Sequence, residues 1–407
     1  MKPEIKERID KIKRGEMPDG YKTSKIGVIP EDWDVKHLED ISNINPRKEV
    51  LDENDTVSFI SMSDVSDDAR LISYQPRLYK EVFKGFTAFR DRDVLVAKIT
   101  PCFENGKGAL VDNLINKTGF GSTEFHVLRS KKNGDELFIY YHTVTDRFRK
   151  IGEKNMTGTA GQKRISTDFV KGFLIPYPRN DIERKKITSI LSTWDKAIEL
   201  KEKLIEQKKK QKKGLMQKLL TGEVRLPGFY GEWEKVSFSD IFIKTKVKKH
   251  QIKTNEYLES GKYPVVDQGQ KKVTAYSNDE EKVFEVPETG VIVFGDHTRE
   301  IKFIDFDFII GADGTQVLMT KDDYDVRFYY YHLLIQKIPN TGYNRHFKFL
   351  KEMIFNKPSL KEQKAISNLL STIDKELDLL NAELSALNEQ KKGLMQLLLT
   401  GKVRVKV

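Results

Sequence analysis

We first consider the residues whose side chains could carry out a reaction. Asp296, Glu300 and Lys302 loosely resemble the carboxylate and lysine pattern of a nuclease, but the two acids lie closer together than that pattern requires. His126 and His297 have no second ligand at the spacing of a metal site, so we expect no bound metal. These residues therefore do not predict a nuclease or a metal-dependent enzyme.

Two further motifs of enzymes that act on nucleotides or DNA are missing. The phosphate-binding loop Gly-x-x-x-x-Gly-Lys-Ser/Thr does not occur in the sequence, which argues against an ATP-driven motor. The nearest fragment to the Asn-Pro-Pro-aromatic motif of amino-methyltransferases is Asn45-Pro46-Arg47, which lacks the second proline and the aromatic residue. We therefore expect a protein that recognises a ligand and has no catalytic residue or cofactor of its own.

The composition favours a negatively charged partner. Lysine and arginine number 71 against 61 aspartate and glutamate, so the net charge is +10. Many lysines are concentrated between Lys201 and Lys213, where they form a solvated helix face, a contact with DNA phosphates or a contact with a partner. The 407 residues are enough for two or three domains with their own cores.

Three features favour a cytoplasmic location. The single cysteine, Cys102, excludes an internal disulfide and is interpreted as a small buried apolar residue. Apolar runs stay well below the roughly 20 residues that span a bilayer, so we expect no membrane contact. Residues 1–20 are polar and charged, which is not typical of a signal peptide.

The elements that must position any recognition residues are organised around a repeat. The stretch Glu183–Arg225 aligns with Glu362–Arg404 without a gap, and about half of the aligned residues are identical. The identities include polar residues, such as Asp195 with Asp374. Helical packing alone would explain a repeated apolar pattern, but it would not explain repeated polar residues.

Both copies of the repeat have the pattern of a long helix. Apolar residues from Ile366 to Leu398 follow the 4,3,4,3 spacing of a coiled coil, whereas Lys201, Lys208 and Lys212 interrupt the same seam in the first copy. Each helix would be about 57 Å long at about 1.5 Å per residue. We expect an antiparallel coiled coil; the alternative is that each helix packs into a separate core.

Residues at the ends of the repeat agree with this prediction. Ser359 with Glu362 is typical of a capping box at a helix start, and Asn180 occupies the equivalent position before the first copy. Gly222 and Gly401 supply the helix ends. The expected helices therefore have defined starts and stops.

The rest of the chain has the texture of two mixed α/β domains, in which glycine, aspartate and asparagine separate short β-type runs. We therefore predict an α+β fold with a pseudo-twofold internal repeat. The predicted segments are a lead-in with a short helix (1–32), a first globular domain (33–178), a first helix (179–225), a second globular domain (226–358), and a second helix with a tail (359–407).

Individual elements of the domains can also be predicted. The β-type runs are Val57–Ile60, Val94–Ile99, Phe125–Leu128, Phe173–Ile175, Tyr263–Val266, Gly290–Phe294, Phe303–Ile310 and Thr315–Met319. The helical candidates are Glu4–Arg14, Glu136–Phe148 and Val326–Ile338. Apart from their entrances, at Trp33 and Trp233, and their exits, the two domains do not resemble each other in sequence. We interpret the helices as a fixed frame and the domains as its variable parts.

Several segments resemble the DNA specificity subunits of type I restriction-modification systems. In the first domain these are Asp93–Gly108 and Gly119–Arg129, and in the second they are Tyr263–Gln270, Gly295–Arg299 and Ile309–Leu318. The helix end Lys-Lys-Gly-Leu-Met-Gln, followed by Leu-Leu-Thr-Gly, is also similar to that family. The order of domain, helix, domain and helix matches the family over essentially the whole chain.

The resemblance implies a non-enzymatic subunit that binds double-stranded DNA. Each globular domain would be a target recognition domain that reads one half of a bipartite sequence. The helices would set the spacer and recruit two methyltransferase subunits and, in the full complex, two restriction subunits, which are motor-nucleases. S-adenosylmethionine would belong to the methyltransferases and ATP to the motors. The candidate partner contacts are Asp195, Gln217, Asp374 and Gln396.

DNA-reading residues are expected in loops beside glycine, because Arg, Lys, Asn, Gln, Ser and Thr side chains contact base edges and phosphates. The candidates in the first domain are Lys98, Thr100, Lys107, Ser122, Thr123, Gln162, Lys163 and Arg164. The candidates in the second domain are Gln268, Gln270, His297, Thr298, Arg299, Tyr343, Asn344, Arg345, His346 and Lys348.

Two other functions stay open. The chain could be a separate recognition subunit of another type of restriction-modification system. It could also be a coiled-coil scaffold whose globular domains bind proteins. The scaffold would show no salt-dependent affinity for DNA, whereas a DNA reader loses affinity steeply as the salt concentration rises.

Overall fold

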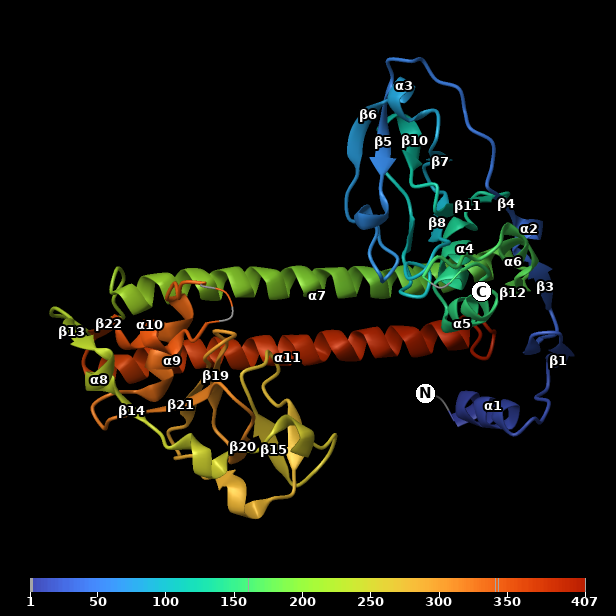
Figure 1. Ribbon diagram of the computed structural model, residues 1–407. Coiled ribbons are helices and arrows are strands. Elements are labelled where there is room, and N and C mark those ends of the chain that lie inside the picture. Colours follow the sequence, from blue (N-terminus) through green and yellow to red (C-terminus); the bar gives the residue numbers. More distant parts are fainter. Residues whose placement is uncertain (1–2, 160, 341, 343, 407) are drawn as a thin grey trace. The chain divides into compact units, whose positions relative to one another are not determined.

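A computed structural model describes residues 3–159, 161–340, 342 and 344–406 (Figure 1). The chain forms two compact units. Unit 1 contains Met1–Leu200 and Leu384–Val407, and unit 2 contains the continuous segment Lys201–Glu383. Each unit therefore includes part of both copies of the repeat. The five segments expected from the sequence divide the chain differently and stay a prediction.

The two copies of the repeat form the long helices α7 (Asp181–Thr221) and α11 (Leu360–Leu398), as predicted. Each is followed by a glycine in the left-handed region: Gly222, directly after α7, has φ of 78°, and Gly401, three residues after α11, has φ of 71°. A side chain at Gly401 would also place its Cβ 2.5 Å from Pro30 Cδ. Glycine is therefore required at this helix end for both its backbone conformation and its packing.

The helix starts are capped as expected, but the capping boxes are incomplete. Asn180 Oδ1 accepts a hydrogen bond from the amide of Ile182 at 2.9 Å, and Ser359 Oγ accepts one from the amide of Glu362 at 3.3 Å. The carboxylates of Glu183 and Glu362 bind arginine and tryptophan side chains instead. Each carboxylate therefore forms a charge-assisted contact with an arginine in place of the return bond of a capping box.

Unit 1 contains a hairpin, two four-stranded sheets and a further strand pair. Its strands are β1 (Tyr21–Ser24), β2 (Gly27–Pro30), β3 (Trp33–His37), β4 (Ser42–Ile44), β5 (Thr56–Ile60), β6 (Gln75–Leu78), β7 (Thr87–Arg90), β8 (Val94–Ala97), β9 (Gly108–Leu110), β10 (Thr118–Gly121), β11 (Phe125–Ser130) and β12 (Leu174–Pro178). The sheets have the orders β6-β5-β10-β7 and β4-β11-β8-β9; β12 pairs with β3 and β1 with β2.

Unit 2 contains two four-stranded sheets and one strand pair. Its strands are β13 (Glu234–Ser237), β14 (Phe242–Lys244), β15 (Tyr263–Val266), β16 (Ala275–Ser277), β17 (Val283–Phe284), β18 (Val291–Gly295), β19 (Ile301–Ile304), β20 (Phe308–Ile310), β21 (Thr315–Thr320) and β22 (Ile354–Lys357). The sheets have the orders β16-β15-β20-β17 and β14-β21-β18-β19, and β13 pairs with β22.

The remaining elements are short helices. In unit 1 they are α1 (Pro3–Lys13), α2 (Leu38–Ile41), α3 (Tyr79–Val82), α4 (Glu136–Thr143), α5 (Asp146–Lys154), α6 (Thr167–Gly172) and the 3₁₀ turns η1 (Met62–Asp64) and η2 (Ile115–Lys117). In unit 2 they are α8 (Phe238–Ile241), α9 (Val326–Ile335), α10 (Phe347–Lys351) and the 3₁₀ turns η3 (Val247–His250), η4 (Thr254–Glu256) and η5 (Glu280–Lys282). The mixed α/β class is confirmed.

Both domains have the same strand order, which the sequence did not reveal. Each strand from β3 to β12 in unit 1 corresponds to the strand in unit 2 whose number is higher by ten. The two strands of each such pair occupy the same position in corresponding sheets. The pairs β5–β10 and β15–β20 are both parallel, and their neighbours are antiparallel. The likeness of the two domains therefore extends beyond the entrances and exits that match in sequence. Strand pairing depends on backbone geometry and buried apolar character, which unlike sequences can share.

Two segments that were each predicted as one element contain parts of two elements in the structure. The segment Glu136–Phe148 contains α4 and the start of α5, because the Thr145 hydroxyl accepts from the amide of Phe148 at 3.3 Å and begins a new helix. The run Phe303–Ile310 contains the end of β19 and all of β20, separated by a bend at Phe306. Apolar character continues through this bend, so the pattern alone does not mark it.

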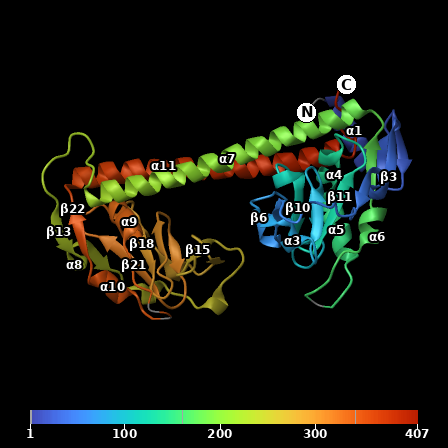
Figure 2. The same ribbon diagram turned by 90° about the horizontal axis from the view of Figure 1, so that it is seen from above.

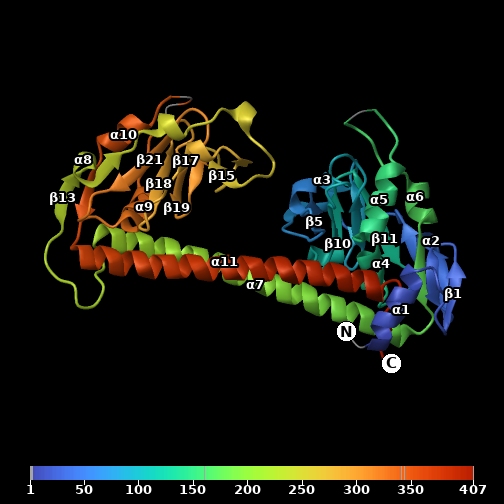
Figure 3. The same cartoon turned by 90° about the horizontal axis from the view of Figure 1, so that it is seen from below.

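The largest core of each unit joins its domain to both long helices. In unit 1 the buried helix residues of this core are Ile187, Leu191, Met395, Leu398 and Leu399. In unit 2 they are Met216, Leu219, Leu220, Ile366 and Leu370. Figure 2 shows α4 between the long helices and the unit 1 sheet, and Figure 3 shows α9 in the same role in unit 2. The start of one helix and the end of the other thus complete each core.

Lysines that interrupt the apolar seam of α7 form ion pairs with α11 inside unit 2. The pairs are Lys201 with Glu383 at 2.7 Å, Lys208 with Glu376 at 2.8 Å, and Lys212 with Asp374. Residue numbers rise along α7 as they fall along α11, so the two helix segments of this unit are antiparallel. Pairs with this much exposure stabilise by about 0–1 kcal/mol each. They therefore contribute more to the register of α7 against α11 than to the stability of the fold.

Candidate nucleic-acid interface

Three loops of unit 1 bring most of the first domain's predicted residues together. The backbone amide of Thr100 donates to the carbonyl of Lys163, and that of Lys98 donates to Glu124, both at 2.9 Å. The amide of Ile165 donates to the carbonyl of Lys98, also at 2.9 Å. We call this surface the first face; it consists of Lys98, Thr100, Ser122, Thr123, Gln162, Lys163 and Arg164.

One arginine fixes the loops of the first face. The Arg164 guanidinium donates to both carboxylate oxygens of Glu124, with Nη2 2.8 Å from Oε1 and Nε 3.0 Å from Oε2. Arg164 thereby holds the pKa of the Glu124 carboxyl below its usual range. Another Arg164 donor, Nη1, reaches the carbonyl of Gln162 at 3.1 Å. Arg164 therefore orients the loops, while Thr123, Gln162 and Lys163 stay exposed.

Lys107 does not join the first face. Its ammonium donates to the carbonyls of Met62 at 3.1 Å and Val65 at 2.8 Å. Two of its three donors thus hold backbone inside the domain, which gives Lys107 a structural role in place of the predicted DNA contact. The nearby Thr100 hydroxyl donates to Glu104 Oε1 at 2.7 Å, so Thr100 also has a partner within the chain.

Gln268 joins the corresponding loops of unit 2. Its side-chain amide donates to the carbonyl of Asp313 at 2.9 Å, and its Oε1 accepts from the backbone amide of His297 at 3.2 Å. The Thr298 hydroxyl donates to the carbonyl of Gln268 at 2.6 Å. Gln268 is therefore the loop-fixing residue of this domain, as Arg164 is in the first domain.

Glycines allow the loops around Gln268 to lie this close. A Cβ at Gly295 would lie 2.2 Å from Thr298 Oγ1. Gly314 has φ of 88°, and a Cβ there would lie 2.8 Å from His297 Cδ2. The glycines that directed attention to these loops in the sequence are thus needed for close approach of the backbone.

The last loop of unit 2 is attached through Asp296. The Phe347 amide donates to Asp296 Oδ1 at 2.7 Å, and the His346 ring lies 2.9 Å from the Asp296 carbonyl. His346 is fully buried, so this conformation gives it a packing role and not the predicted DNA contact. Arg299 donates to the carbonyl of Ile338 at 3.3 Å.

We call the exposed part of this surface the second face. Its members are Gln270, Thr298, Asn344, Arg345 and Lys348. Tyr343, which was also predicted here, lies outside the described residues. Like the first face, the second face combines amide, hydroxyl and cationic side chains, which suit base edges and phosphates.

The residues first considered for catalysis have structural contacts. The Lys302 ammonium donates to the carbonyls of Asp267 at 2.9 Å and Lys271 at 2.5 Å, and burial lowers its pKa. The ring of His126 lies 3.1 Å from the Ile165 carbonyl and 3.2 Å from Asn45 Nδ2. In the described part of the chain, no group of three or more His, Cys, Asp or Glu side chains is arranged to hold a metal ion.

Glu183 and Glu362 occupy equivalent positions in the two long helices, and each binds the tryptophan at the entrance of a domain. Trp33 Nε1 donates to Glu183 at 3.1 Å, and the Arg404 guanidinium donates to the same carboxylate at 2.6 Å. In unit 2, Glu362 is bound in the same way by Trp233 Nε1 at 3.2 Å and by the guanidinium of Arg225 at 2.6 Å. The sequence contained this signal, since all six residues are members of the repeat or of the matched domain entrances.

A second repeated contact uses residues that the sequence analysis missed. The hydroxyl of Tyr141 in α4 donates to Asp195, and that of Tyr331 in α9 donates to Asp374, both at 2.6 Å. These tyrosines belong to a Phe-x-Tyr-Tyr-His motif that occurs at residues 138–142 and again at 328–332. A search for short repeats inside the domains would have found it. Asp195 and Asp374, predicted to bind partners, are engaged inside the chain, whereas Gln217 and Gln396 are exposed.

The histidines that close this motif are buried. His142 Nε2 and His332 Nε2 have no hydrogen-bond partner among the residues that the structure describes. Burial lowers the pKa of His142 to about 3 and that of His332 to about 4. Both rings are therefore neutral near pH 7 and act as packing groups beside Phe138 and Phe328.

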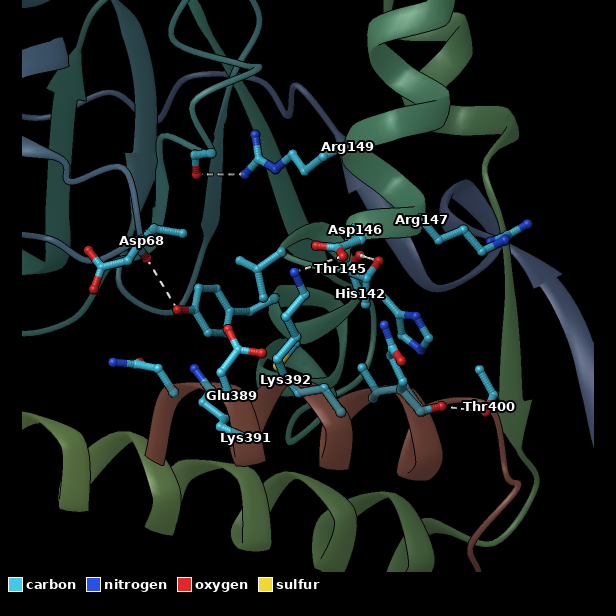
Figure 4. A pocket seen from close by; sticks show the side chains of 18 of the residues that line it. Asp68, His142, Thr145, Asp146, Arg147, Arg149, Glu389, Lys391, Lys392 and Thr400 are labelled. Carbon is cyan, nitrogen blue, oxygen red and sulfur yellow. Dashed lines mark hydrogen bonds and ion pairs between the residues drawn. The ribbon is translucent and has the colours of Figure 1, made fainter. Parts of the chain in front are cut away.

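A pocket of about 660 Å³ lies in unit 1 between α11 and the helices α4 and α5. Figure 4 shows Lys392 and Asp146 pointing toward each other there, and their charged groups are 3.0 Å apart. The Arg149 guanidinium donates to the carbonyls of Phe103 at 3.0 Å and Gly106 at 2.9 Å, and burial lowers its pKa to about 10. Arg149 thus supports the loop that follows Thr100 of the first face.

Comparison with known families identifies this arrangement. A family model described as the type I restriction modification DNA specificity domain matches residues 30–209 and again residues 230–389. The chain belongs to this family. The two matches cover most of the sequence, and each begins near the tryptophan that enters one of the two domains.

Curated members of the family give the same result. The EcoEI specificity subunit of Escherichia coli is 36% identical over 183 residues, which are 44% of this chain and 30% of that protein. The EcoAI specificity subunit is 33% identical over 46% of this chain and 34% of its own length, so the matches span about a third of these two relatives. The MjaX specificity subunit of Methanocaldococcus jannaschii, a putative assignment, is 26% identical over 95% of this chain and 97% of its length.

Solved structures show the same fold. The S subunit of a type I restriction-modification system from M. genitalium has a TM-score of 0.59 at 19% identity, covering 90% of this chain and 96% of its own. A chain from a study of type I complex assembly has a TM-score of 0.58 at 18% identity, covering 92% and 99%. Among the described residues of this specificity-family chain, no helix is long and apolar enough to cross a membrane.

Proposed function

We propose that this chain is the non-catalytic specificity subunit of a type I restriction-modification system and that it binds a bipartite sequence in double-stranded DNA. One observation carries the proposal: two domains of the same strand order each gather exposed amide, hydroxyl and cationic side chains on one set of loops. Each domain reads one half of the target. The family membership of both halves of the chain supports this function.

The proposed reading divides the contacts by charge. Lys163, Arg345 and Lys348 bind phosphates, which contribute affinity and salt dependence. The hydroxyl of Thr123, the amide of Gln162 and the amides of Gln270 and Asn344 in the second face read base edges in the major groove. Arg164 and Gln268 hold their loops in shape, so the reading groups are positioned before DNA binds.

The long helices act as the spacer in this proposal. They pack as an antiparallel coiled coil, with a pseudo-twofold relation between the two halves of the chain. The repeated contacts at Glu183 and Glu362, and those at Asp195 and Asp374, support this symmetry. A helix pair of about 57 Å is long enough for two domains to contact major-groove faces about 34 Å, or one turn of duplex, apart.

The same symmetry accounts for the proposed partners. Two methyltransferase subunits dock on equivalent helix surfaces that include the exposed Gln217 and Gln396, and two restriction subunits join the full complex. S-adenosylmethionine and ATP then bind to those partners. An assembly that modifies cellular DNA acts in the cytoplasm. Gln217→Ala with Gln396→Ala should weaken copurification of the methyltransferase, whereas Lys13→Ala, in exposed α1, should not.

Sequencing of methylated DNA tests the proposal directly. The chain is coexpressed with the methyltransferase subunits, and methylated sites in the host genome are mapped at single-molecule resolution. We expect one motif with two specified halves and an unspecified spacer of fixed length. Absence of any methylated motif, together with DNA affinity that does not change with salt, would favour the protein-binding scaffold instead.

A further inference from the structure

One carboxylate in unit 1 joins three separate elements. Asp195 of α7 accepts a hydrogen bond at 2.6 Å from Tyr141 of α4 and forms an ion pair with Lys391 of α11. The ammonium of Lys391 also lies 5.9 Å from the centre of the Tyr141 ring. We call Tyr141, Asp195 and Lys391 the first lock, because they fix the domain helix to both long helices at one point.

Unit 2 has a lock of the same composition. Asp374 of α11 accepts from Tyr331 of α9 at 2.6 Å and forms an ion pair with Lys212 of α7. The ammonium of Lys212 lies 5.3 Å from the centre of the Tyr331 ring. In the second lock, the roles of α7 and α11 are exchanged.

In each lock the tyrosine hydroxyl stays protonated, so it can donate a hydrogen bond to the aspartate. Tyr141 and Tyr331 are almost completely buried, and burial together with the neighbouring aspartate raises the pKa of both hydroxyls. A short hydrogen bond from a hydroxyl to an ionised carboxylate is stronger and more directional than a neutral one. The domain helix is therefore held in one orientation against the aspartate.

The lock is one of several contacts between the domain and α7 in unit 1. Arg184 donates to Asp135 at 2.8 Å, and the Trp33 and Arg404 contact at Glu183 lies twelve positions before Asp195 in the helix. At 1.5 Å per residue, the two points lie about 18 Å apart along the axis. Contacts confined to the start of α7 would leave the domain more able to tilt, whereas a further directional contact at this separation fixes its angle.

We infer that Tyr141 and Tyr331 are positioning residues that set the angle of each recognition domain on the helices and thereby the spacer length that the complex accepts. The inference rests on the proposed function. The tyrosines lie in the cores at the helices and are not part of either face. Loss of a lock therefore relaxes the required spacing, while each face continues to recognise its own half-site.

The test uses the complete complex with methyltransferase subunits and the target found by methylation sequencing. Affinity is measured for that target and for DNAs whose spacer is one base pair longer or shorter. For Tyr141→Phe and for Tyr331→Phe, we expect the preference for the native spacer to fall by about tenfold, the order of one hydrogen bond to a charged group. Preference for the bases of both half-sites should stay unchanged.

Neighbouring tyrosines provide matched controls. The hydroxyl of Tyr140 donates to the Ala69 carbonyl and that of Tyr329 to the Asn356 carbonyl, both at 3.2 Å. Tyr140→Phe and Tyr329→Phe remove the same atom from the same domain helices without touching a lock. These variants should retain the native spacer preference, which separates positioning from a general loss of stability.

Lys391→Gln gives an independent check if Tyr141→Phe does not fold, because Lys391 lies on the partly exposed side of the lock. This variant should relax the spacer preference as well. Folded Tyr141→Phe or Lys391→Gln complexes that discriminate between spacers as strongly as the wild type would overturn the inference. Failure of the wild-type complex to bind any bipartite sequence would instead refute the proposed function.

Discussion

Polar residues of the two faces and of the loops that support them fall into two classes that have the same chemistry. Arg164 and Gln268 use their donors and acceptors within the chain, where they hold loops together. Thr123 and Lys163 are exposed and free to face solvent. The proposed base and phosphate contacts require the second class, whereas the first class determines whether those contacts are correctly placed.

Lys163 provides a test at this scale. Removing its charge with Lys163→Ala should weaken binding about equally for all DNA sequences and reduce the slope of log affinity against log salt concentration by about 1. Fluorescence anisotropy over a salt series measures both quantities. Lys13→Ala is the control, since Lys13 is an exposed lysine outside the faces. An unchanged slope for Lys163→Ala would remove this lysine from the phosphate contacts.

The buried histidines predict a dependence of stability on pH. Because burial lowers the pKa of His142 and His332 to about 3 and 4, the unfolded chain binds protons below about pH 6.5 while the folded chain does not. Their contribution to the free energy of unfolding is complete above pH 6.5 and is lost as the pH falls toward 4. The loss at pH 5.5 is about 1.4 kcal/mol for each histidine.

Urea unfolding at several pH values between 7 and 5 measures this effect. The double variant His142→Gln, His332→Gln should show a shallower decline in the free energy of unfolding than the wild type. Equal declines in the two proteins would show that other groups cause the dependence.

The sequence indicates which loops carry polar residues, but it does not indicate which of those residues are exposed. Residue type and neighbouring glycine directed attention to the loops of Lys163 and Thr298, which are exposed in the structure, because both properties are visible in the sequence. The same rule also selected Lys107 and His346, which the structure uses for internal contacts. Burial and hydrogen-bond partners depend on residues far away in the chain, so type alone could not separate the two classes.

At the scale of elements, the long helices were predictable because their signal extends over many residues. Periodicity, caps and the repeat all indicated α7 and α11. The shared strand order of the domains was not predictable, because short strands have weak signals and their pairing depends on distant partners, such as β5 with β10. The lysines of the seam were ambiguous for the same reason: their acidic partners lie on the other helix.

Two glycines allow a matched test of where the long helices run and where they end. Gly214 lies inside α7, where a Cβ would meet nothing within 4 Å, whereas Gly401 has positive φ and faces Pro30. Gly214→Ala should raise the free energy of unfolding by about 0.5–1 kcal/mol, because alanine favours the helix. Gly401→Ala should lower it, because the new side chain is strained and clashes. Thermal unfolding of both variants gives the sign, and the same sign for both would contradict the assignment of the helix end.

At the scale of the whole molecule, each domain is attached to the helices by the same two kinds of contact, through tryptophan and through tyrosine. The attachment is conserved between the two halves of this chain, while the loops of the two faces differ. A recognition domain is therefore expected to be exchangeable as long as its attachment residues are kept.

Domain exchange tests this expectation. Replacing residues 33–178 with the first domain of another family member should change one half of the methylated motif and leave the other half and the spacer unchanged. Methylation sequencing of the host genome provides the readout, and the reciprocal exchange of residues 226–358 is the control. A change in both halves would show that the domains do not read independently.

The division of the chain between the two units also determines the order in which they can form during synthesis. Unit 2 is continuous and has all of its residues once Glu383 has been made. Unit 1 is interrupted, and its core lacks Met395, Leu398 and Leu399 until the end of the chain emerges from the ribosome. Until then the core around Ile187 and Leu191 is incomplete, so the domain made first is the last to be completed. A nascent chain at this stage exposes apolar surface that aggregates or binds chaperones, and ribosome-bound chains ending before residue 384 should show unit 1 as the protease-sensitive part.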